Sequence, residues 1–152
     1  MPVSNLITSF NQSLNHLQSP LLLSFRLYVS YVFLMSGLQK INNWDMTLTL
    51  FEYEYAVPVL PFELAAYLAT AGELILPVLL IAGLGTRLFA IALSVLNIVA
   101  VISYYDALAK VGQVTPHIFW GACLLTLITF GGGFFSLDHW LNSRQRDWFT
   151  NP

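Results

Sequence analysis

Charged side chains are scarce in this sequence. Asp, Glu, Lys and Arg together make up 9% of the 152 residues, whereas an ordinary soluble domain carries roughly 25% of these residues. Hydrophobic residues account for 57% of the chain. With so few charges to cover a surface, most of the chain has to face something other than water, and a lipid bilayer is the solvent that this composition indicates.

Residues that build cofactor sites are scarce as well. A single cysteine, Cys123, excludes an internal disulfide framework and a cysteine-ligated iron–sulfur cluster. His16 and His139 fall in flanking segments, so His117 lacks a second histidine at its depth for a bis-histidine haem. The net charge of −2 and the absence of a Lys/Arg cluster argue against nucleic acid as a partner. We therefore expect no metal site, no covalently bound cofactor and no nucleic-acid binding.

Four apolar segments are about the length that a helix needs to cross the hydrocarbon, which is roughly 20 residues. These segments are residues 20–38, 62–83, 87–105 and 116–135. Prolines 20, 61 and 116 lie at the start of three of them, where a missing N–H costs least. The sequence therefore predicts an all-α integral membrane protein, an antiparallel bundle of four transmembrane helices that forms one domain over residues 20–135.

The segments outside the predicted spans carry apolar residues at helical spacing. Residues 1–19 and 136–152 are each predicted to be an amphipathic interfacial segment, the second of them on the cytosolic side. The connection between the first two spans repeats apolar residues every three or four positions. These are Trp44, Leu48, Phe51 and Tyr55. We predict a short helix there, lying on the outer surface, with Glu52 and Glu54 facing water.

Orientation is predicted from the basic residues. Four spans place both termini on one side of the membrane, together with Arg87, Arg144 and Arg146, while Lys40 and Lys110 fall on the other side. By the positive-inside rule the termini are cytoplasmic, in a multi-pass protein of a bacterial-type inner (plasma) membrane. Residues 1–19 contain no Lys or Arg, so we do not expect the first span to be a cleavable signal peptide.

Each predicted span carries one line of small or polar residues at helical spacing. The lines are Arg26, Ser30, Phe33 and Gly37; Ala66, Ala69 and Glu73; Ala90, Ser94 and Asn97; and Ala122, Thr126, Thr129 and Gly133. Helices in lipid associate through small and hydrogen-bonding residues, because burying apolar faces against each other gains little there. The four lines are therefore expected to face inward and to form a polar seam.

Glu73 is the residue that this seam has to explain, because a charge near the bilayer centre costs several kcal/mol. Arg26 lies about one helical turn from the predicted depth of Glu73, and we predict that the two form an ion pair. Ser30, Ser94, Asn97 and Thr126 complete a predicted ligand-binding or structural seam. Three interpretations stay open: a tie that fixes helix register, a pocket for a lipid-soluble ligand, and a proton or ion path.

His117 suggests a second, smaller site. It lies at the outer end of the fourth span, where Asp106 or Tyr105 can join it in a site on the outer surface. Anchoring at the membrane interface is the alternative role for the same histidine.

Three stretches of the chain carry a family resemblance. They are "LLLSFRLYVSYVFLMSGLQKI", which holds an arginine and a G-x-x-K exit, "LATAGELILPVLLIAGLGTRLFAIAL", which holds a glutamate helix and a G-x-x-T-R turn, and "FGGGFFSLDHWL". In this order they resemble the DoxX family of small four-span membrane proteins. The resemblance covers roughly residues 20–141, and its matching positions are Arg26, Lys40, Glu73, Arg87 and Asp138.

The resemblance implies a link to respiratory or sulfur redox chemistry, since the family is named for a subunit of a thiosulfate:quinone oxidoreductase. It implies an accessory or binding subunit of a quinone-linked or oxidative-stress redox system rather than a stand-alone enzyme, and no residue is predicted to be catalytic. A quinone or other lipid would be the ligand, and a redox-enzyme partner subunit would carry the electrons. The alternatives are a small-molecule or proton transporter, for which a homo-oligomer would give the room, and a structural anchor for a soluble enzyme.

Overall fold

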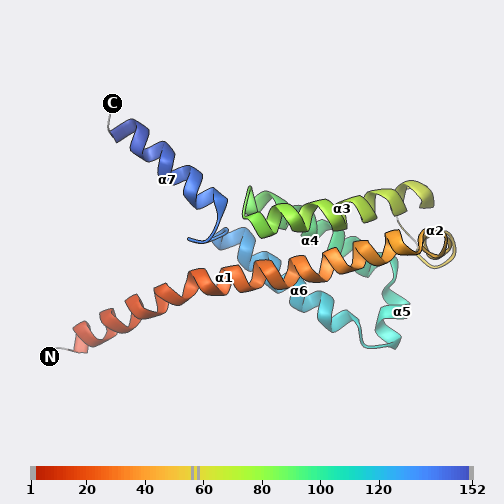
Figure 1. Ribbon diagram of the computed structural model, residues 1–152. Coiled ribbons are helices and arrows are strands. Elements are labelled where there is room, and N and C mark those ends of the chain that lie inside the picture. Colours follow the sequence, from red (N-terminus) through yellow and green to blue (C-terminus); the bar gives the residue numbers. More distant parts are fainter. Residues whose placement is uncertain (1–2, 56, 58, 151–152) are drawn as a thin grey trace.

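The structure is a computed structural model that describes the backbone of residues 3–55, 57 and 59–150, and the side chains of residues 10, 14–55, 57 and 59–143. Over these residues every regular element is a helix (Figure 1). The helices are α1 (Val3–Asn42), α2 (Trp44–Tyr53), α3 (Phe62–Ala82), α4 (Thr86–Ser103), α5 (Tyr105–Lys110), α6 (Val114–Phe130) and α7 (Leu137–Thr150). The predicted all-α class is confirmed.

Three of the described helices are long and apolar enough to cross a membrane, namely the Leu14–Asn42 part of α1, all of α3 and all of α4. Helix α6 is apolar as well, but it has 17 residues. The four helices run back and forth between two ends of the molecule (Figure 1). One end carries both termini and α7, and the other carries α2 and α5.

Helix α4 shows how the sequence sets the inside and the outside of the bundle. Its small and polar residues at 86, 90 and 97 are buried, together with Leu93. The large apolar residues between them are exposed. These are Leu88, Ile91, Val95, Ile98 and Ile102. An outer surface of large apolar side chains around a more polar interior suits a helix that meets lipid on one face and other helices on the opposite face.

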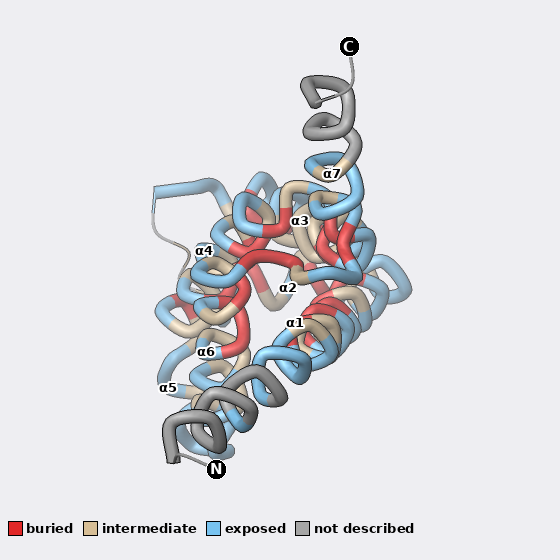
Figure 2. Tube along the Cα trace, turned by 90° about the vertical axis from the view of Figure 1, so that its left-hand side faces the viewer, coloured by how far each residue is buried: buried red, intermediate tan, exposed pale blue. Residues whose placement is uncertain are grey.

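The predicted inward lines hold for most of the bundle but not for its last long helix. In α1 all four residues of the line are buried, and buried residues gather along the interior (Figure 2). In α6 the prediction is wrong, because Ala122 and Thr129 are exposed and the buried face is Cys123, Leu124 and Leu127. Thr126 and Thr129 donate their hydroxyl protons to carbonyls of their own helix, so they need no partner from another helix.

The ends of the chain differ in detail from the predicted pattern. Helix α1 continues through Pro20 without a break, so the N-terminal segment and the first predicted span belong to one helix, residues 3–42. The tail from 137 to 150 is helical, as its spacing indicates. The side chains of Arg144 and Arg146, which entered the predicted orientation, lie outside the described residues.

The helix predicted in the connection between the first two spans exists as α2, which packs on the first half of α3. Phe51 is buried against Ala65 and Ala66, with Trp44 and Leu48 beside them. The side chains of Glu52 and Glu54 are exposed, as expected. This packing places α2 at the end of the bundle opposite to α7, next to the site described below (Figure 1).

Candidate functional site

Arg26 is buried at the end of the bundle that carries the termini, with 1% of its surface exposed. Its guanidinium donates to the main-chain carbonyls of Leu80 and Ile81, at 3.1 and 2.8 Å, where α3 ends. It also donates to the carbonyls of Gly132 and Phe135, at 2.8 and 3.1 Å, in the segment after α6. The last carbonyls of a helix lack their usual partners and carry the negative end of its dipole, so a cation is well placed there. The carbonyl of Leu80 also accepts the N–H proton of Gly83, at 3.0 Å.

The predicted ion pair between Arg26 and Glu73 is therefore wrong. Glu73 binds Lys40 instead, with 2.6 Å between Lys40 Nζ and Glu73 Oε2. The reason is the register of the two antiparallel helices. Arg26 lies beside Leu80, which is seven residues from Glu73 and so about 10 Å along α3 at 1.5 Å per residue. That is about two helical turns, where the sequence estimate gave one.

A glycine fixes this register. A Cβ added to Gly37 would lie 2.9 Å from Cγ of Leu74 and 3.1 Å from Cβ of Glu73, so the bare backbone of α1 lets α3 approach closely. Lys40 lies three residues after Gly37, and its ammonium also donates to Ser36 Oγ at 2.9 Å. The Lys40 and Glu73 side chains are 18% and 12% exposed, which leaves the pair partly buried.

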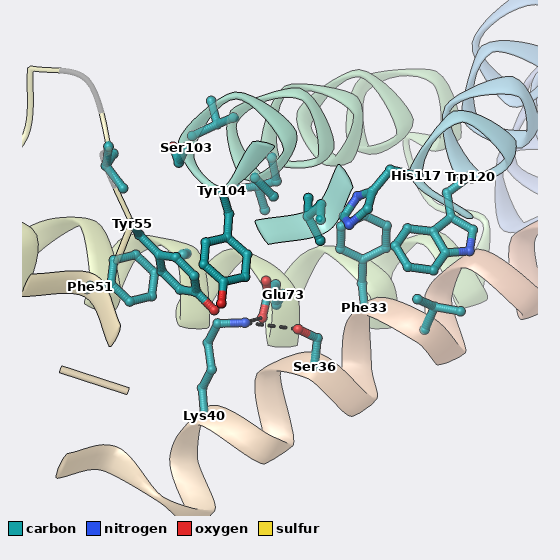
Figure 3. A pocket seen from close by; sticks show the side chains of 17 residues that line it. Phe33, Ser36, Lys40, Phe51, Tyr55, Glu73, Ser103, Tyr104, His117 and Trp120 are labelled. Carbon is teal, nitrogen blue, oxygen red and sulfur yellow. Dashed lines mark hydrogen bonds and ion pairs between the residues drawn. The ribbon is translucent and has the colours of Figure 1, made fainter. Parts of the chain in front are cut away.

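The pair forms part of the wall of a cavity of about 280 Å³. Side chains from α1, α3, α4 and α6 line it, and α2, α5 and the connections after α2 and α4 complete the lining. Most of this lining is apolar or aromatic. Its polar members are Ser36, Lys40, Tyr55, Glu73, Ser103, Tyr104 and His117 (Figure 3). Ser103 Oγ is buried and has no hydrogen-bond partner among the described residues.

Asn97 does not line the cavity but binds His117, which does. Asn97 Nδ2 donates to the main-chain carbonyl of His117 at 2.9 Å, and Asn97 Oδ1 lies 2.8 Å from His117 Nδ1. The imidazole packs against Trp120 in an edge-on arrangement, with 4.5 Å between ring centroids. Figure 3 shows His117 and Trp120 at one side of the cavity, Phe51 and Tyr55 at the other, and Glu73 between them.

Two tyrosines border the cavity at the end next to α2 and α5. Tyr55 and Tyr104 pack edge to face, with 4.6 Å between centroids, and Tyr104 Oη donates to Glu54 Oε2 at 2.7 Å. This hydrogen bond to an ionised carboxylate raises the pKa of Tyr104 to about 12. Burial, together with the nearby carboxylates of Glu73 and Glu54, raises the pKa of Tyr55. Both hydroxyls therefore stay protonated at neutral pH and can donate hydrogen bonds.

A family model agrees with the resemblance noted in the sequence. The model of the DoxX family matches residues 21–106, which is more than half of the chain. The chain belongs to the DoxX family. A protein of Haemophilus influenzae, itself described as uncharacterized, is 36% identical over 123 residues, which cover 77% of this chain and 80% of that protein. No solved structure matches the chain.

The motif positions of this DoxX protein fall into two groups in space. Lys40 and Glu73 meet at the cavity, whereas Arg26, Arg87 and Asp138 lie at the opposite end of the bundle. Asp138 accepts the N–H protons of residues 85 and 86 at 2.7 and 2.8 Å, which are free at the start of α4. Arg87 is exposed and donates to the carbonyl of Thr129 at 3.2 Å. The second group ties helix ends together around Arg26.

The remaining predicted site residues are spread through the bundle. Ser94 donates to the carbonyl of Ala90 in its own helix, and the buried hydroxyl of Ser30 has no partner among the described residues. Asp106 is exposed on α5, and the structure gives it no hydrogen bond or ion pair with a described residue. His117 therefore meets Asn97 rather than Asp106, because α6 turns its imidazole toward α4.

Sequence reasoning missed Lys40 as the partner of Glu73, and it missed the aromatic wall of the cavity. A signal for Lys40 was present, because Ser36, Gly37 and Lys40 put a hydroxyl, a close-approach position and a cation on one stretch of helix. No comparable signal existed for Tyr55 and Tyr104. These two residues are 49 positions apart and lie outside the helices, and only the packing of α2 against α3 brings them together.

Proposed function

We propose that this DoxX protein binds a lipid-soluble molecule of the quinone type in the cavity beside Lys40 and Glu73, and that it serves a redox enzyme as an accessory membrane subunit. The observation that carries the proposal is the Lys40–Glu73 ion pair in the wall of an otherwise apolar cavity of about 280 Å³. Intramembrane ionisable residues are expensive to keep and mark functional sites by default.

The composition of the cavity supports a ligand of this class. Pockets for small organic molecules are typically apolar and aromatic, with a few convergent polar groups, and start at about 300 Å³. This cavity is close to that lower bound, which suits one substituted ring with its lipid tail outside. Lys40 and Tyr55 offer hydrogen-bond donors, and Glu73 offers acceptor oxygens.

The accessory role follows from the family resemblance and from what the cavity offers. A quinone carries its own electrons, so the protein has to supply a binding site and orientation rather than a redox centre of its own. In this proposal a redox-enzyme partner subunit exchanges electrons with the bound ring. The outer helix α2, which covers one side of the cavity, is a surface through which that partner can contact the site.

The proposal includes a topology of four membrane crossings by α1, α3, α4 and α6, with both termini in the cytoplasm of a bacterial cell. At 17 residues, α6 is at the short end of the range for a transmembrane helix. Both termini lie at the same end of the molecule, as an even number of crossings requires (Figure 1). Lys40 and the cavity then lie toward the outer side of the membrane.

The test is mass spectrometry of the organic extract from gently purified protein. Wild type is compared with Glu73→Gln, which keeps the shape of the side chain and removes its charge. Glu63→Gln is the matched control, because Glu63 lies on the same helix and is exposed. A quinone or other defined lipid that is enriched in wild type and in the control, and is lost in Glu73→Gln, is the expected result. Equal extracts from all three proteins would refute the proposal.

A further inference from the structure

The orientation of the Asn97 side chain can be assigned from its own contacts. One end of its amide faces the main-chain carbonyl of His117 at 2.9 Å, and the other end faces His117 Nδ1 at 2.8 Å. A main-chain carbonyl only accepts hydrogen bonds, so the amide NH₂ has to be the group that faces it. The amide oxygen then faces the imidazole.

This orientation decides which nitrogen of the imidazole carries the proton. An amide oxygen only accepts, so His117 Nδ1 has to donate, and the neutral ring has its proton on Nδ1. His117 Nε2 is then an unprotonated acceptor. It has no hydrogen-bond partner among the described residues, and the ring lines the cavity next to Trp120 (Figure 3). The cavity thus contains one acceptor at this side that no described group satisfies.

The opposite side of the cavity can both donate and accept. Lys40 Nζ has three protons and gives two of them to Ser36 and Glu73, which leaves one for a ligand. Glu73 keeps its second carboxylate oxygen as an acceptor. This side therefore accommodates a carbonyl or a hydroxyl equally, and any preference between the two has to come from His117.

We propose that the cavity selects the reduced, hydroxylated form of its ligand, a quinol or a phenol-type ring, because the ligand hydroxyl donates its proton to His117 Nε2. If a quinone carbonyl occupied that position, a lone pair of its oxygen would face the lone pair of Nε2. Neither acceptor would then have a hydrogen-bond donor. The inference rests on the proposed function above and names the redox state that the site binds. Asn97 is a positioning residue, since it holds the tautomer and does not line the cavity.

The first experiment compares two redox forms of one probe by isothermal titration calorimetry in detergent micelles. The probe is a decyl-substituted benzoquinone and its quinol, both kept anaerobic at about pH 8, above the reference imidazole pKa of about 6.5. We expect wild type to bind the quinol at least about tenfold more tightly than the quinone, as one hydrogen bond against one unpaired acceptor implies. His117→Phe keeps a ring and should bring the ratio to about one. His139→Phe, on the exposed α7, should leave it unchanged.

The second experiment reads the tautomer directly and does not depend on any cavity variant folding. A His16→Gln/His139→Gln protein retains His117 as its one histidine, and ¹⁵N NMR of the labelled imidazole distinguishes a proton on Nδ1 from one on Nε2. We expect Nδ1–H in the free protein and a shift of the Nε2 resonance when the quinol probe is added. In the same background Asn97→Leu should yield a mixture of tautomers and a smaller affinity ratio.

The outcomes separate this inference from the proposed function. A quinol preference together with the Nδ1–H tautomer supports both. Equal affinity of wild type for the two probe forms, or a proton found on Nε2, overturns the inference and leaves the ligand site in place. If neither form of the probe binds wild type, the proposed function fails, and the inference fails with it.

Discussion

Replacement of Arg26 by methionine tests whether one buried cation holds together the end of the bundle that carries the termini. The methionine fills much of the same volume and removes every donor. Four carbonyls then lose the guanidinium as a partner. The carbonyl of Leu80 keeps the N–H of Gly83, at 3.0 Å, and those of Ile81 and Phe135 are partly buried and can turn to water. The cost therefore comes mainly from the buried carbonyl of Gly132.

The magnitude follows from the Gly132 carbonyl. A buried acceptor left without a partner costs about 1–3 kcal/mol. The variant should therefore lose about 1–3 kcal/mol of unfolding free energy, reduced somewhat because the desolvation cost of the guanidinium disappears as well. A loss of this size is a large fraction of the stability of a typical domain. The unfolding free energy of Arg26→Lys should lie between those of wild type and Arg26→Met, because an ammonium has three donors and a shorter reach.

The assay is unfolding in mixed micelles with increasing SDS, followed by circular dichroism. Arg87→Met is the control, because Arg87 is exposed and donates to a single carbonyl. It should change the unfolding free energy by less than about 1 kcal/mol. If Arg26→Met is as stable as the control, the hydrogen bonds from Arg26 to main-chain carbonyls do not hold the helix ends, and the account given above for Arg26 is refuted.

Three further predictions concern single contacts. Gly37→Ala should cost about 1–3 kcal/mol in the same assay, since its new methyl would come within 2.9 Å of an α3 side chain; Gly121→Ala meets its nearest atom at 3.6 Å and should cost less. Asp138→Ala should cost about 0.5–2 kcal/mol through loss of the α4 cap, and an unchanged transition would contradict that role. The bond from Tyr104 to Glu54 should stabilise the fold below about pH 10 and be lost as pH rises through about 12. Absorbance titration should therefore show a late tyrosinate phase that Tyr104→Phe removes, and a titration that Tyr104→Phe leaves unchanged would contradict the assignment.

The helical, membrane-capable fold could be predicted because it depends on composition and periodicity. The line of small and polar residues on α1 points inward as predicted, since Gly37 and Ser30 are useful only where helices meet. The same logic failed for α6. Threonine satisfies its hydroxyl within its own helix, so Thr126 and Thr129 carry no information about which face is buried.

The partner of Glu73 could not be predicted, because it depends on helix register. The sequence estimate placed Arg26 one helical turn from Glu73, whereas the distance along α3 is about two turns. An estimate of depth from span ends is not accurate to one turn. A sequence also does not show which main-chain carbonyls will accept a hydrogen bond from a distant side chain. Arg26 was predicted to pair with a carboxylate because only side-chain partners can be identified from residue types. Its actual partners are four main-chain carbonyls.

The hydrogen bonds from Arg26 to four main-chain carbonyls have a consequence for biosynthesis. The acceptors of its guanidinium lie between 54 and 109 residues further along the chain. When α1 first reaches the membrane, none of them has been made, and an arginine near the middle of an isolated helix costs about 2.5–3.5 kcal/mol on insertion scales. The first helix is therefore least stable in the bilayer before the later helices are made. Its stabilisation is complete once residues 132–135, which follow the last long helix, have been synthesised. We expect truncated nascent chains that end before residue 132 to hold α1 less firmly in the bilayer than the full chain does.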